Sequence, residues 1–550
     1  MARAFDLDIP RWQERTLEVL PAFLSWGFLL GLIILSATNI ALATYTIIGY
    51  ALLWMLKIIG YSGRLVKGYS LVRVLQNINW RERLKDLKSP QKAQARVDQE
   101  LKSVSGGQQI ALKNYKRLLD QAAYNNETLN PDDLLHVVII AAYNESKDII
   151  ESTIEAVLAN DYNHQQVAVL LAYEQRGGAQ IAKDARELQQ VYGKSFKLFK
   201  AIEHPADIPG EVKGKGGNIT FAGRWFAKYA EKNNINPEHV IVTTLDSDNR
   251  PAKDYLAYLS YVYCVVDDRI TKSFQPMAMF MNNIWDVPAL SRVIATNNSF
   301  WLLMEAMRPH RLRNFSAHAQ SLAALLETDF WNVRSIVEDG HQYWRSYFIF
   351  NGNHTVVPLF TAIYQDAVLA ETYMKTFYEQ FKQLRRWAWG VSDTPFVVVN
   401  MIRYKTIPLG QRLIQLFRQI EGYFSWATAS IVLVAGGWLP LLVNSASDQS
   451  LVISQLPVLA SRIQTVALLG LLAPVIASIM SFPPLPKEYS RFRYLSIIWQ
   501  WLLIPVALIG FGSVAALNAQ TRLAINKPLE QFDVTAKFRK TKPNTDEVLS

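Results

Sequence analysis

Cysteine is almost absent from this sequence of 550 residues, which contains Cys264 alone. A disulfide-stapled secreted scaffold is therefore excluded, because that cysteine has no partner within the chain. Charged residues are also scarce at 19%, below the roughly 25% that is usual in soluble domains. Gly and Pro occur in ordinary numbers and 50% of the residues are hydrophobic, which excludes collagen-like and disordered classes. These shortages favour a membrane protein with a large soluble part.

Charge is missing completely from the run Val19–Leu56. A single helix over this run would be about 57 Å long, against about 30 Å for the hydrocarbon core of a bilayer. Two short spans that turn near residues 36–39 are therefore predicted, and they define an N-terminal membrane segment over residues 1–61.

Three more uncharged runs lie near the other end of the chain and predict a C-terminal membrane segment over residues 422–521. This segment would contain two or three spans, depending on whether its last run crosses the bilayer or is re-entrant or interfacial. The runs are Gly422–Ser447, Ile463–Pro486 and Tyr494–Thr521.

Lys and Arg near the spans predict the orientation of the chain. The turn at residues 36–39 has none, whereas residues 57–88 contain Lys57, Arg64, Lys67, Arg73, Arg81, Arg83, Lys85 and Lys88. The net charge of +10 is therefore expected largely beside the inner membrane face. We predict a multi-pass protein of the inner (cytoplasmic) membrane whose N-terminus and soluble middle lie in the cytoplasm.

The soluble middle begins with a charged segment of helical pattern over residues 62–133, which we interpret as a cytoplasmic connector. From residue 134 onwards, short apolar runs alternate with helical stretches, which predicts an α/β domain over residues 134–395 with a mostly parallel sheet and helices on both faces. Interfacial helices are expected at residues 396–421. The predicted strands are 136–142, 167–172, 196–202 and 240–245.

Polar side chains follow the ends of these predicted strands, where ligands of parallel sheets bind. Asn144 and Glu145 follow the first strand, Glu174 follows the second, and Asp246-Ser-Asp248 follows the fourth. The two-residue period of a strand turns Asp246 and Asp248 to the same side. Carboxylate oxygens suit Mg²⁺ or Mn²⁺, which keep positions open for substrate phosphates, whereas no zinc ligand set stands nearby.

A loop rich in Gly and Lys over residues 210–218 precedes a predicted helix over residues 219–231. Its backbone N–H groups, together with Lys213 and Lys215, would form an anion site at the helix N-terminus. The spacing is not that of a Walker P-loop. A flexible surface loop is the alternative interpretation.

Two further motifs lie closer to the C-terminal membrane segment. Glu338-Asp339 opens a stretch dense in aromatic residues, and Gln383-x-x-Arg386-Trp387 follows it. A guanidinium group can clamp a diphosphate bidentately, and an indole face can stack on a sugar ring. An amphipathic interfacial helix is the alternative interpretation of the second motif.

In this order, the motifs resemble those of the membrane-integrated family 2 glycosyltransferases, the group that contains cellulose, chitin and hyaluronan synthases. The resemblance covers roughly residues 134–390 and the pattern of flanking spans, and its strongest elements are Asp246-Ser-Asp248, Glu338-Asp339 and Gln383-x-x-Arg386-Trp387. It implies a GT-A-like fold and an inverting transfer of sugar from a nucleotide-diphosphate donor, with a UDP-sugar favoured, to a growing glycan. Two departures are that Glu174 stands where the family usually has a uracil-binding Asp, and Val337 where Thr is common.

The resemblance also implies a role for each matching residue. Asp339, beside Glu338, is the candidate catalytic base, and Asp246 and Asp248 would hold Mg²⁺ or Mn²⁺. Gln383 and Trp387 would hold the acceptor sugar. The donor-binding candidates are Asn144, Glu145, Glu174, Lys215, Asn218, Asp246 and Arg386.

The tail over residues 522–550 contains Phe532-Asp-Val-Thr535-Ala-Lys537, which is similar to the gating loop of cellulose synthases. In that family the loop covers the nucleotide from the cytoplasm. The resemblance therefore implies a cytoplasmic tail, with Phe532, Thr535 and Lys537 near the donor.

Three functions stay open at this point. A processive polysaccharide synthase is favoured by Gln383-x-x-Arg386-Trp387. A single-sugar transferase acting on a lipid-linked acceptor is favoured by the small number of spans, unless a homo-oligomer or an export partner completes a channel. A transporter or sensor is disfavoured because the uncharged runs lack the ionisable groups that transport pathways use. Nucleic-acid binding is not expected, since basic residues concentrate beside the bilayer and no reading motif is present.

Overall fold

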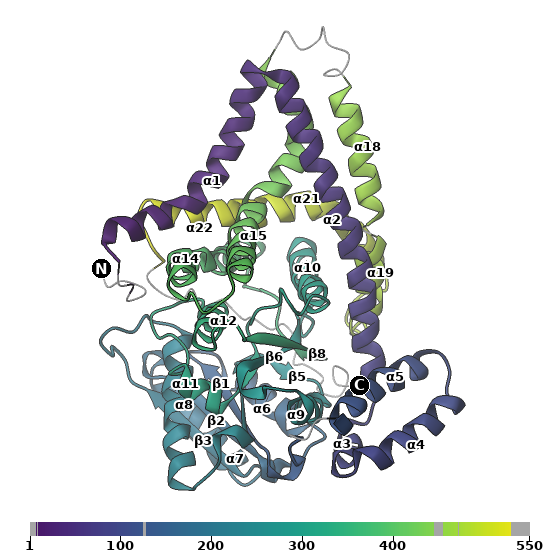
Figure 1. Ribbon diagram of the computed structural model, residues 1–550, viewed down its shortest axis with the longest axis vertical. Coiled ribbons are helices and arrows are strands. Elements are labelled where there is room, and N and C mark those ends of the chain that lie inside the picture. The colour runs from purple at the N-terminus through teal and green to yellow at the C-terminus, as the bar shows by residue number, and fades with distance from the viewer. Residues whose placement is uncertain (1–6, 8, 125–127, 445–454, 471, 530–550) are drawn as a thin grey trace.

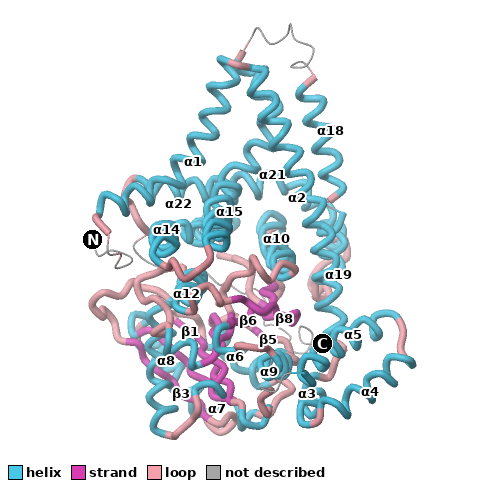
Figure 2. The backbone as a smooth tube through the Cα atoms, viewed as in Figure 1, coloured by secondary structure: helices cyan, strands magenta, loops and turns pink. Residues whose placement is uncertain are grey.

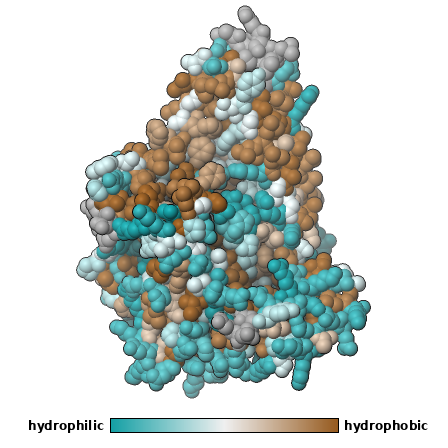
Figure 3. All heavy atoms as spheres, in the orientation of Figure 1, coloured by the Kyte–Doolittle hydropathy of each residue, from teal (hydrophilic) through white to brown (hydrophobic). Residues whose placement is uncertain are grey.

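The computed structural model describes residues 7, 9–124, 128–444, 455–470 and 472–529. In Figure 1 a helical hairpin stands above a domain built around a β-sheet, and a second group of helices lies between the two. Hydrophobic residues gather over the hairpin, whereas hydrophilic residues cover the sheet domain (Figure 3).

The hairpin consists of α1 (Arg11–Thr38) and α2 (Ile40–Leu75), which meet close to the predicted turn at residues 36–39. That these two helices cross a membrane stays a prediction. Asn39 makes the turn, and its side chain caps α2 by accepting a hydrogen bond from the N–H of Leu42 at 3.1 Å. Within the described residues, four helices are long and apolar enough to cross a membrane. They are Arg11–Thr38, Ile40–Leu75, Leu409–Val443 and Arg493–Ala524.

The apolar run Ile463–Pro486 does not form one of these four helices. It is divided between α18 (Leu456–Leu469) and α19 (Leu472–Ser481), which both pack along α2. α2 itself continues past residue 61, the predicted end of the N-terminal membrane segment, and enters the predicted connector.

The last apolar run contains α20 (Arg493–Trp499), α21 (Ile504–Val506), a π-helical stretch (Ala507–Ser513) and α22 (Val514–Ala524). Figure 1 shows α21 and α22 lying across the lower end of the hairpin instead of beside it. An interfacial segment has this orientation, and the re-entrant or interfacial placement of the run stays a prediction.

Eight strands in the described part of the chain form one mixed sheet, in the order β3-β2-β1-β4-β7-β6-β8-β5. The predicted parallel strands are all present, because β1 pairs in parallel with both β2 and β4, and β2 with β3. The strands are β1 (Leu135–Ala142), β2 (Val167–Glu174), β3 (Leu198–His204), β4 (Val240–Asp246), β5 (Arg250–Pro251), β6 (Lys272–Met279), β7 (His318–Ser321) and β8 (Thr355–Tyr364).

Helices cover both faces of the parallel strands, as predicted. Alternate residues of β1 face opposite clusters: Val138 and Ile140 pack with α6 and α9, whereas Val137 and Ile139 pack with α8 and α11. The fold is therefore an α/β fold with candidate membrane-spanning helices on either side of it in the sequence. The covering helices are α6 (Lys147–Leu158), α7 (Ala179–Tyr192), α8 (Lys215–Lys232), α9 (Tyr255–Val265) and α11 (Leu322–Glu327).

The predicted connector is helical, with α3 (Trp80–Arg83), α4 (Pro90–Ser103) and α5 (Gly106–Tyr124). It is attached to the sheet domain by aromatic packing, since Trp80 stacks on Tyr258 of α9 at 4.2 Å between ring centroids.

A middle layer of helices lies between the strands and α1, whereas the later part of α2 passes this layer and contacts β8 (Figure 2). The layer contains α10 (Ala289–Ala306), α12 (Glu338–Ile349), α13 (Tyr373–Ala388), α14 (Thr394–Arg403) and the first half of α15 (Leu409–Ala435).

Candidate functional site

The order of the parallel strands reverses between β1 and β4, because β2 and β3 lie on one side of β1 and β4 lies on the other. Ligands of open α/β sheets bind at such a reversal, beyond the carboxyl ends of the strands. Asp246 is the last residue of β4, and Asn144 follows the end of β1. The structure thus places the predicted strand-end residues where a ligand is expected.

Lys215 is the first residue of α8, and its side chain is buried between carboxylates. Its Nζ lies 2.8 Å from Asp246 Oδ1 and 3.9 Å from Glu338 Oε1. The helix begins four residues earlier than the predicted start at residue 219. Gly216 permits this start, because a Cβ there would lie only 2.8 Å from the carbonyl oxygen of Asn332. Lys215 is therefore part of a packed helix start and not of a surface loop.

Ser316 hydrogen bonds to both Asp246, a predicted metal ligand, and Asp339, the predicted base. Its N–H donates to Asp339 Oδ2 at 2.6 Å, and its Oγ donates to Asp246 Oδ2 at 3.0 Å. Gln365 Nε2 in turn donates to Ser316 Oγ at 3.0 Å. The backbone of Ser316 is left-handed, with φ of 49°, a conformation that is enriched at functional sites. The sequence gives no signal for this residue, which is a lone serine in a loop.

Glu338 and Asp339 form the first turn of α12. The N–H of Gly340 donates to Asp339 Oδ1 at 2.7 Å, so both oxygens of this carboxylate have a backbone donor. Burial raises the pKa of Glu338 to about 7, with Lys215 opposing the rise and Asp339 adding to it. Burial acts to lower the pKa of Lys215, but the charges of Asp246 and Glu338 outweigh it and the pKa is raised. Lys215 therefore supplies a fixed positive charge.

Asp248 is buried and is held by residues that the sequence pattern does not indicate. Its Oδ2 accepts from the N–H of Asp366 at 3.2 Å, and its Oδ1 accepts from Asn249 at 3.3 Å. Asn282 donates to the Asp248 carbonyl oxygen at 3.0 Å and to Asp366 Oδ1 at 2.9 Å. Asp366 follows the end of β8, so recognition of β8 as a strand would have drawn attention to it.

The donor-binding candidates Glu145 and Glu174 lie at the ends of β1 and β2, and Glu174 is the last residue of β2. Glu145 Oε2 accepts from the N–H of Tyr143 at 2.7 Å. Glu174 is buried, which raises its pKa, and it forms an ion pair with Arg176. The Arg176 guanidinium lies 5.0 Å from the centre of the Tyr143 ring, so the two strand ends form one connected surface.

Asn218 ties these strand ends together. Its Nδ2 donates to the carbonyl oxygen of Ala142 at 3.3 Å and to that of Ala172 at 2.9 Å. Within the described structure this amide holds β1 and β2 in place, and its predicted role in donor binding stays a prediction.

Gln383, Arg386 and Trp387 lie near the end of α13 and are half-buried. Trp387 packs against Phe280 at 6.0 Å between ring centroids, and Phe280 is two residues before Asn282 of the Asp248 group. Gln383 Oε1 accepts from Gln380 at 3.0 Å. The end of α13 is therefore beside the site.

The residues of the predicted gating loop, Phe532, Thr535 and Lys537, lie outside the described residues. The described chain ends at Leu529, which packs against the apolar cluster containing Val337 and Trp389. Val337 immediately precedes Glu338, so the described chain ends close to the candidate base.

The residues at the end of β4 fit a Mg²⁺ or Mn²⁺ ion that is completed by its substrate. In the described part of the chain, no three His, Cys, Asp or Glu side chains form a ready-made metal cluster. Mg²⁺ is commonly held by one or two carboxylates together with substrate phosphates and water. Asp246 and Asp248 would supply such a pair of hard oxygen ligands, and Asp246 lies next to the cationic Lys215.

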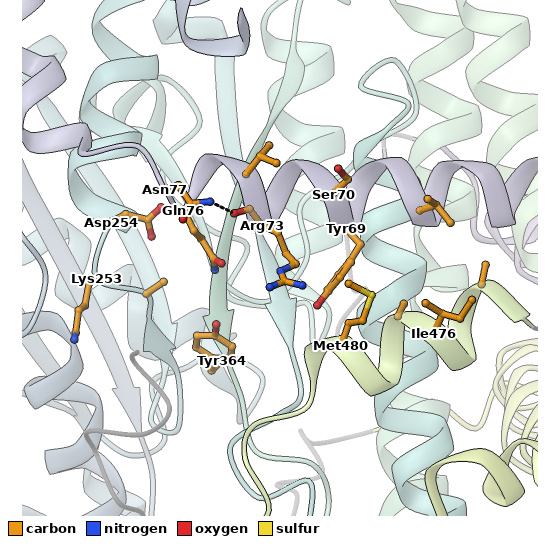
Figure 4. Close-up of a pocket in the computed structure, with 15 residues that line it drawn as sticks. Tyr69, Ser70, Arg73, Gln76, Asn77, Lys253, Asp254, Tyr364, Ile476 and Met480 are labelled. Atoms are coloured by element: carbon orange, nitrogen blue, oxygen red, sulfur yellow. Dashed lines mark hydrogen bonds between the residues drawn. The ribbon is translucent and has the colours of Figure 1, made fainter. Parts of the chain in front are cut away.

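A cavity of about 770 Å³ lies between α2, α19 and the chain that follows β5. Tyr69 and Arg73 of α2 point into this space, toward Tyr364 and Met480 (Figure 4). None of the predicted site residues lines it. The cavity is adjacent to the site in the chain, because Tyr364, which lines the cavity, directly precedes Gln365 and Asp366.

Neither a protein-family model nor a curated protein matches this chain. Among solved structures it is similar to the mannosyltransferase PcManGT from Pyrobaculum calidifontis, in complex with GDP-Man and Mn²⁺. The identity is 13% and the TM-score 0.38, over 80% of this chain and 98% of that one. It is also similar to S. aureus TarS 1–349 in complex with UDP-GlcNAc, with 11% identity and a TM-score of 0.33 over 63% of this chain and 91% of that one. Likenesses this low carry no functional argument.

Proposed function

We propose that this protein is an inverting, metal-dependent family 2 glycosyltransferase. It moves a sugar from a nucleoside diphosphate donor, with a UDP-sugar favoured, to a glycan at the cytoplasmic face of the cell membrane. The observation that carries the proposal is the network at the strand-order reversal, in which Ser316 joins Asp246 to Asp339 and Lys215 stands between Asp246 and Glu338.

The donor half of this network suits a diphosphate. Lys215 and Arg386 would bind its oxygens, and Asp246 and Asp248 would hold Mg²⁺ or Mn²⁺ beside it. When bound, the ion neutralises charge that develops on the leaving diphosphate. Asn144, Glu145 and Glu174 would contact the nucleoside end.

The acceptor half suits deprotonation of a hydroxyl group. Asp339 would take the hydroxyl proton as the acceptor oxygen bonds to the anomeric carbon and the bond from that carbon to the diphosphate breaks. The N–H groups of Ser316 and Gly340 fix the carboxylate for this task. In-line attack inverts the anomeric carbon, and Gln383 and Trp387 would hold the acceptor sugar.

Two acceptors fit the site. A growing polysaccharide is supported by the position of Trp387 at the end of α13, beside Phe280. A lipid-linked acceptor is supported by cationic side chains of α2, α15 and the chain after α10, since that last segment leads to Ser316.

Replacement of Asp339 tests the proposed base. Asp339→Asn is expected to lower transfer at least about 100-fold, the usual contribution of a general base, while nucleotide binding in the presence of Mn²⁺ survives. Asp329→Asn is the matched control, because Asp329 is an exposed carboxylate paired with Arg224 outside the site. Turnover and nucleotide binding of the purified variants would be measured with a panel of labelled nucleotide sugars. Near-normal transfer by Asp339→Asn would defeat the assignment, and donor consumption that survives EDTA would defeat the metal requirement.

A further inference from the structure

Six cationic side chains gather where α2, the chain after α10 and the first half of α15 meet. The guanidinium groups of Arg64 and Arg308 both lie over the ring of Tyr61, at 5.1 and 5.5 Å from its centre. Arg418 Nη1 donates to the carbonyl oxygen of His310 at 2.7 Å. The arginine cluster, as we call it, consists of Lys57, Arg64, Arg308, Arg311, Arg313 and Arg418.

The positive charge of the arginine cluster is only partly compensated. Glu421 Oε1 lies 2.6 Å from Lys57 Nζ, and Glu421 Oε2 lies 3.7 Å from Arg311 Nη2. Glu305 forms an ion pair with Arg308. No carboxylate in the described part of the chain is within ion-pairing distance of the remaining three cations, which are Arg64, Arg313 and Arg418.

Burial and the uncompensated positive charge both lower the pKa of a neighbouring histidine, His310. Burial lowers the pKa of His310, and the charges of Arg418, Arg308 and Arg311 lower it further. Like charges held this close repel one another, so a bound anion would stabilise the arrangement.

The arginine cluster lies beside surface that is suited to a bilayer. Lys57 directly follows the uncharged run of α2, and Arg64 is the next charged residue of this helix. The first half of α15 exposes Leu409, Leu413 and Phe417 at intervals of four residues, and Phe417 directly precedes Arg418. Exposed apolar side chains next to cations are typical of the headgroup level of a membrane, where a basic side chain attracts anionic lipid. The anion expected here is therefore a phosphate carried by a lipid.

The arginine cluster is also close to the catalytic carboxylates. Arg313 stands three residues before Ser316, which limits their Cα separation to about 11 Å. Gln275 fixes the intervening chain, because its side chain accepts from the N–H of Phe315 at 2.8 Å and donates to the carbonyl oxygens of Phe315 and Ala317, each at 3.0 Å. A phosphate held on the arginine cluster would thus be at a set distance from Asp339.

We propose that the arginine cluster binds the phosphate of a lipid-linked acceptor and presents the acceptor hydroxyl to Asp339. This inference rests on the proposed function and names the acceptor class for it.

The test measures lipid binding to the purified full-length protein in a neutral detergent by native mass spectrometry. The probes are a polyprenyl monophosphate, dioleoylphosphatidylglycerol and dioleoylphosphatidylcholine. In the double variant Arg64→Gln, Arg418→Gln, each lost cation is expected to weaken binding of the polyprenyl phosphate about fivefold, equivalent to about 1 kcal/mol. The pair Arg64→Lys, Arg418→Lys should restore most of the affinity, and Lys228→Gln on α8, remote from the arginine cluster, should leave it unchanged.

Each outcome decides the proposal. Equal binding of polyprenyl phosphate by the parent and the Gln pair overturns the site. Phosphatidylglycerol that binds as tightly as polyprenyl phosphate and displaces it marks a site for bulk membrane lipid and overturns the acceptor assignment. Binding of UDP with Mn²⁺ to the parent is measured separately. If the parent does not bind UDP, the proposed glycosyltransferase function is wrong, although the lipid site could still exist. If the parent binds UDP but its lipid binding does not depend on the arginine residues, only the inference about the arginine cluster is wrong.

Discussion

At the scale of single residues, the site depends on side chains that serve two partners at once. Ser316 uses its backbone for Asp339 and its hydroxyl for Asp246. Lys215 lies between Asp246 and Glu338. Because these bonds link the donor half to the acceptor half, a change at one carboxylate is expected to affect the position of the others.

Ser316→Ala removes the hydroxyl hydrogen bonds of this residue and keeps its backbone hydrogen bond. The N–H that holds Asp339 remains, but the hydroxyl that bonds Asp246 and Gln365 is lost. A hydrogen bond to a charged group is worth about 1.5–3 kcal/mol, so kcat is expected to fall roughly 10- to 100-fold. Steady-state kinetics would measure this, with Ser103→Ala in the exposed connector as the control. A parent-like kcat would show that Ser316 does not position the carboxylates.

The raised pKa of Glu338 predicts how stability depends on pH. The unfolded chain releases this proton near pH 4.5, whereas the folded protein retains it to about pH 7. Stability from this group is therefore complete at low pH and is lost as pH rises through that window. Glu338→Gln removes the titrating group, so its thermal unfolding midpoint should fall less steeply than that of the parent as pH rises. Parallel curves for the two proteins would contradict the assignment.

At the scale of elements, the start of α8 determines where the cation is placed. The first turn of this helix packs so closely on the chain around Asn332 that residue 216 has no room for a side chain. The first turn of α12 also contains a glycine, Gly340, but space around it is open. The two helix starts therefore provide a matched pair of substitutions.

Gly216→Ala is expected to displace Lys215 or Glu338, because the new Cβ would lie 2.8 Å from the Asn332 carbonyl oxygen and 3.2 Å from Glu338 Cβ. Nucleotide affinity should fall roughly 5- to 150-fold, in line with the roughly 1–3 kcal/mol cost of overpacking. Gly340→Ala meets nothing within 4 Å and should bind nucleotide as the parent does. Isothermal titration with UDP and Mn²⁺ would compare them, and equal losses in both variants would show that close packing is not the cause.

The elements differ in how well the sequence predicts them. The strands β1, β2 and β4 are buried on both faces, and such strands appear as continuous apolar runs. β6 and β8 were missed, and both contain proline, at residues 276 and 358, which argues against a strand in a local analysis. β7 is only four residues long. Their pairing is decided by neighbours that are distant in the sequence.

At the scale of the whole molecule, the site lies between the sheet and the middle layer of helices, on the side that faces the hairpin (Figure 1). The last apolar segment is tied to the first helix: Arg15 donates to the carbonyl oxygen of Leu523 at 3.0 Å, and Trp26 donates to Thr521 Oγ1 at 2.9 Å. The start of α1 and the end of α22 are therefore on the same side of the hairpin as the sheet domain.

This arrangement predicts which positions can be labelled from which side of a sealed vesicle. Lys527→Cys after α22 and Lys228→Cys on α8 should react with an impermeant maleimide from one side, and Thr38→Cys at the hairpin turn from the other. The native thiol should contribute little, because burial raises the pKa of Cys264 to about 12. Labelling of Lys527→Cys together with Thr38→Cys would show that the last apolar segment crosses the bilayer.

The sequence by itself determined the uncharged stretch around the hairpin turn, the parallel strands and the carboxylates at their ends. Each of these depends on local spacing and burial, which a linear pattern contains. Only the tertiary structure identified Ser316, Asp366 and Asn282 as partners of the predicted carboxylates. It alone also brought the arginine cluster together from α2, the chain after α10, and α15. The physical reason is that these contacts join residues far apart in the chain, where neither spacing nor hydrophobic period records which side chains will meet.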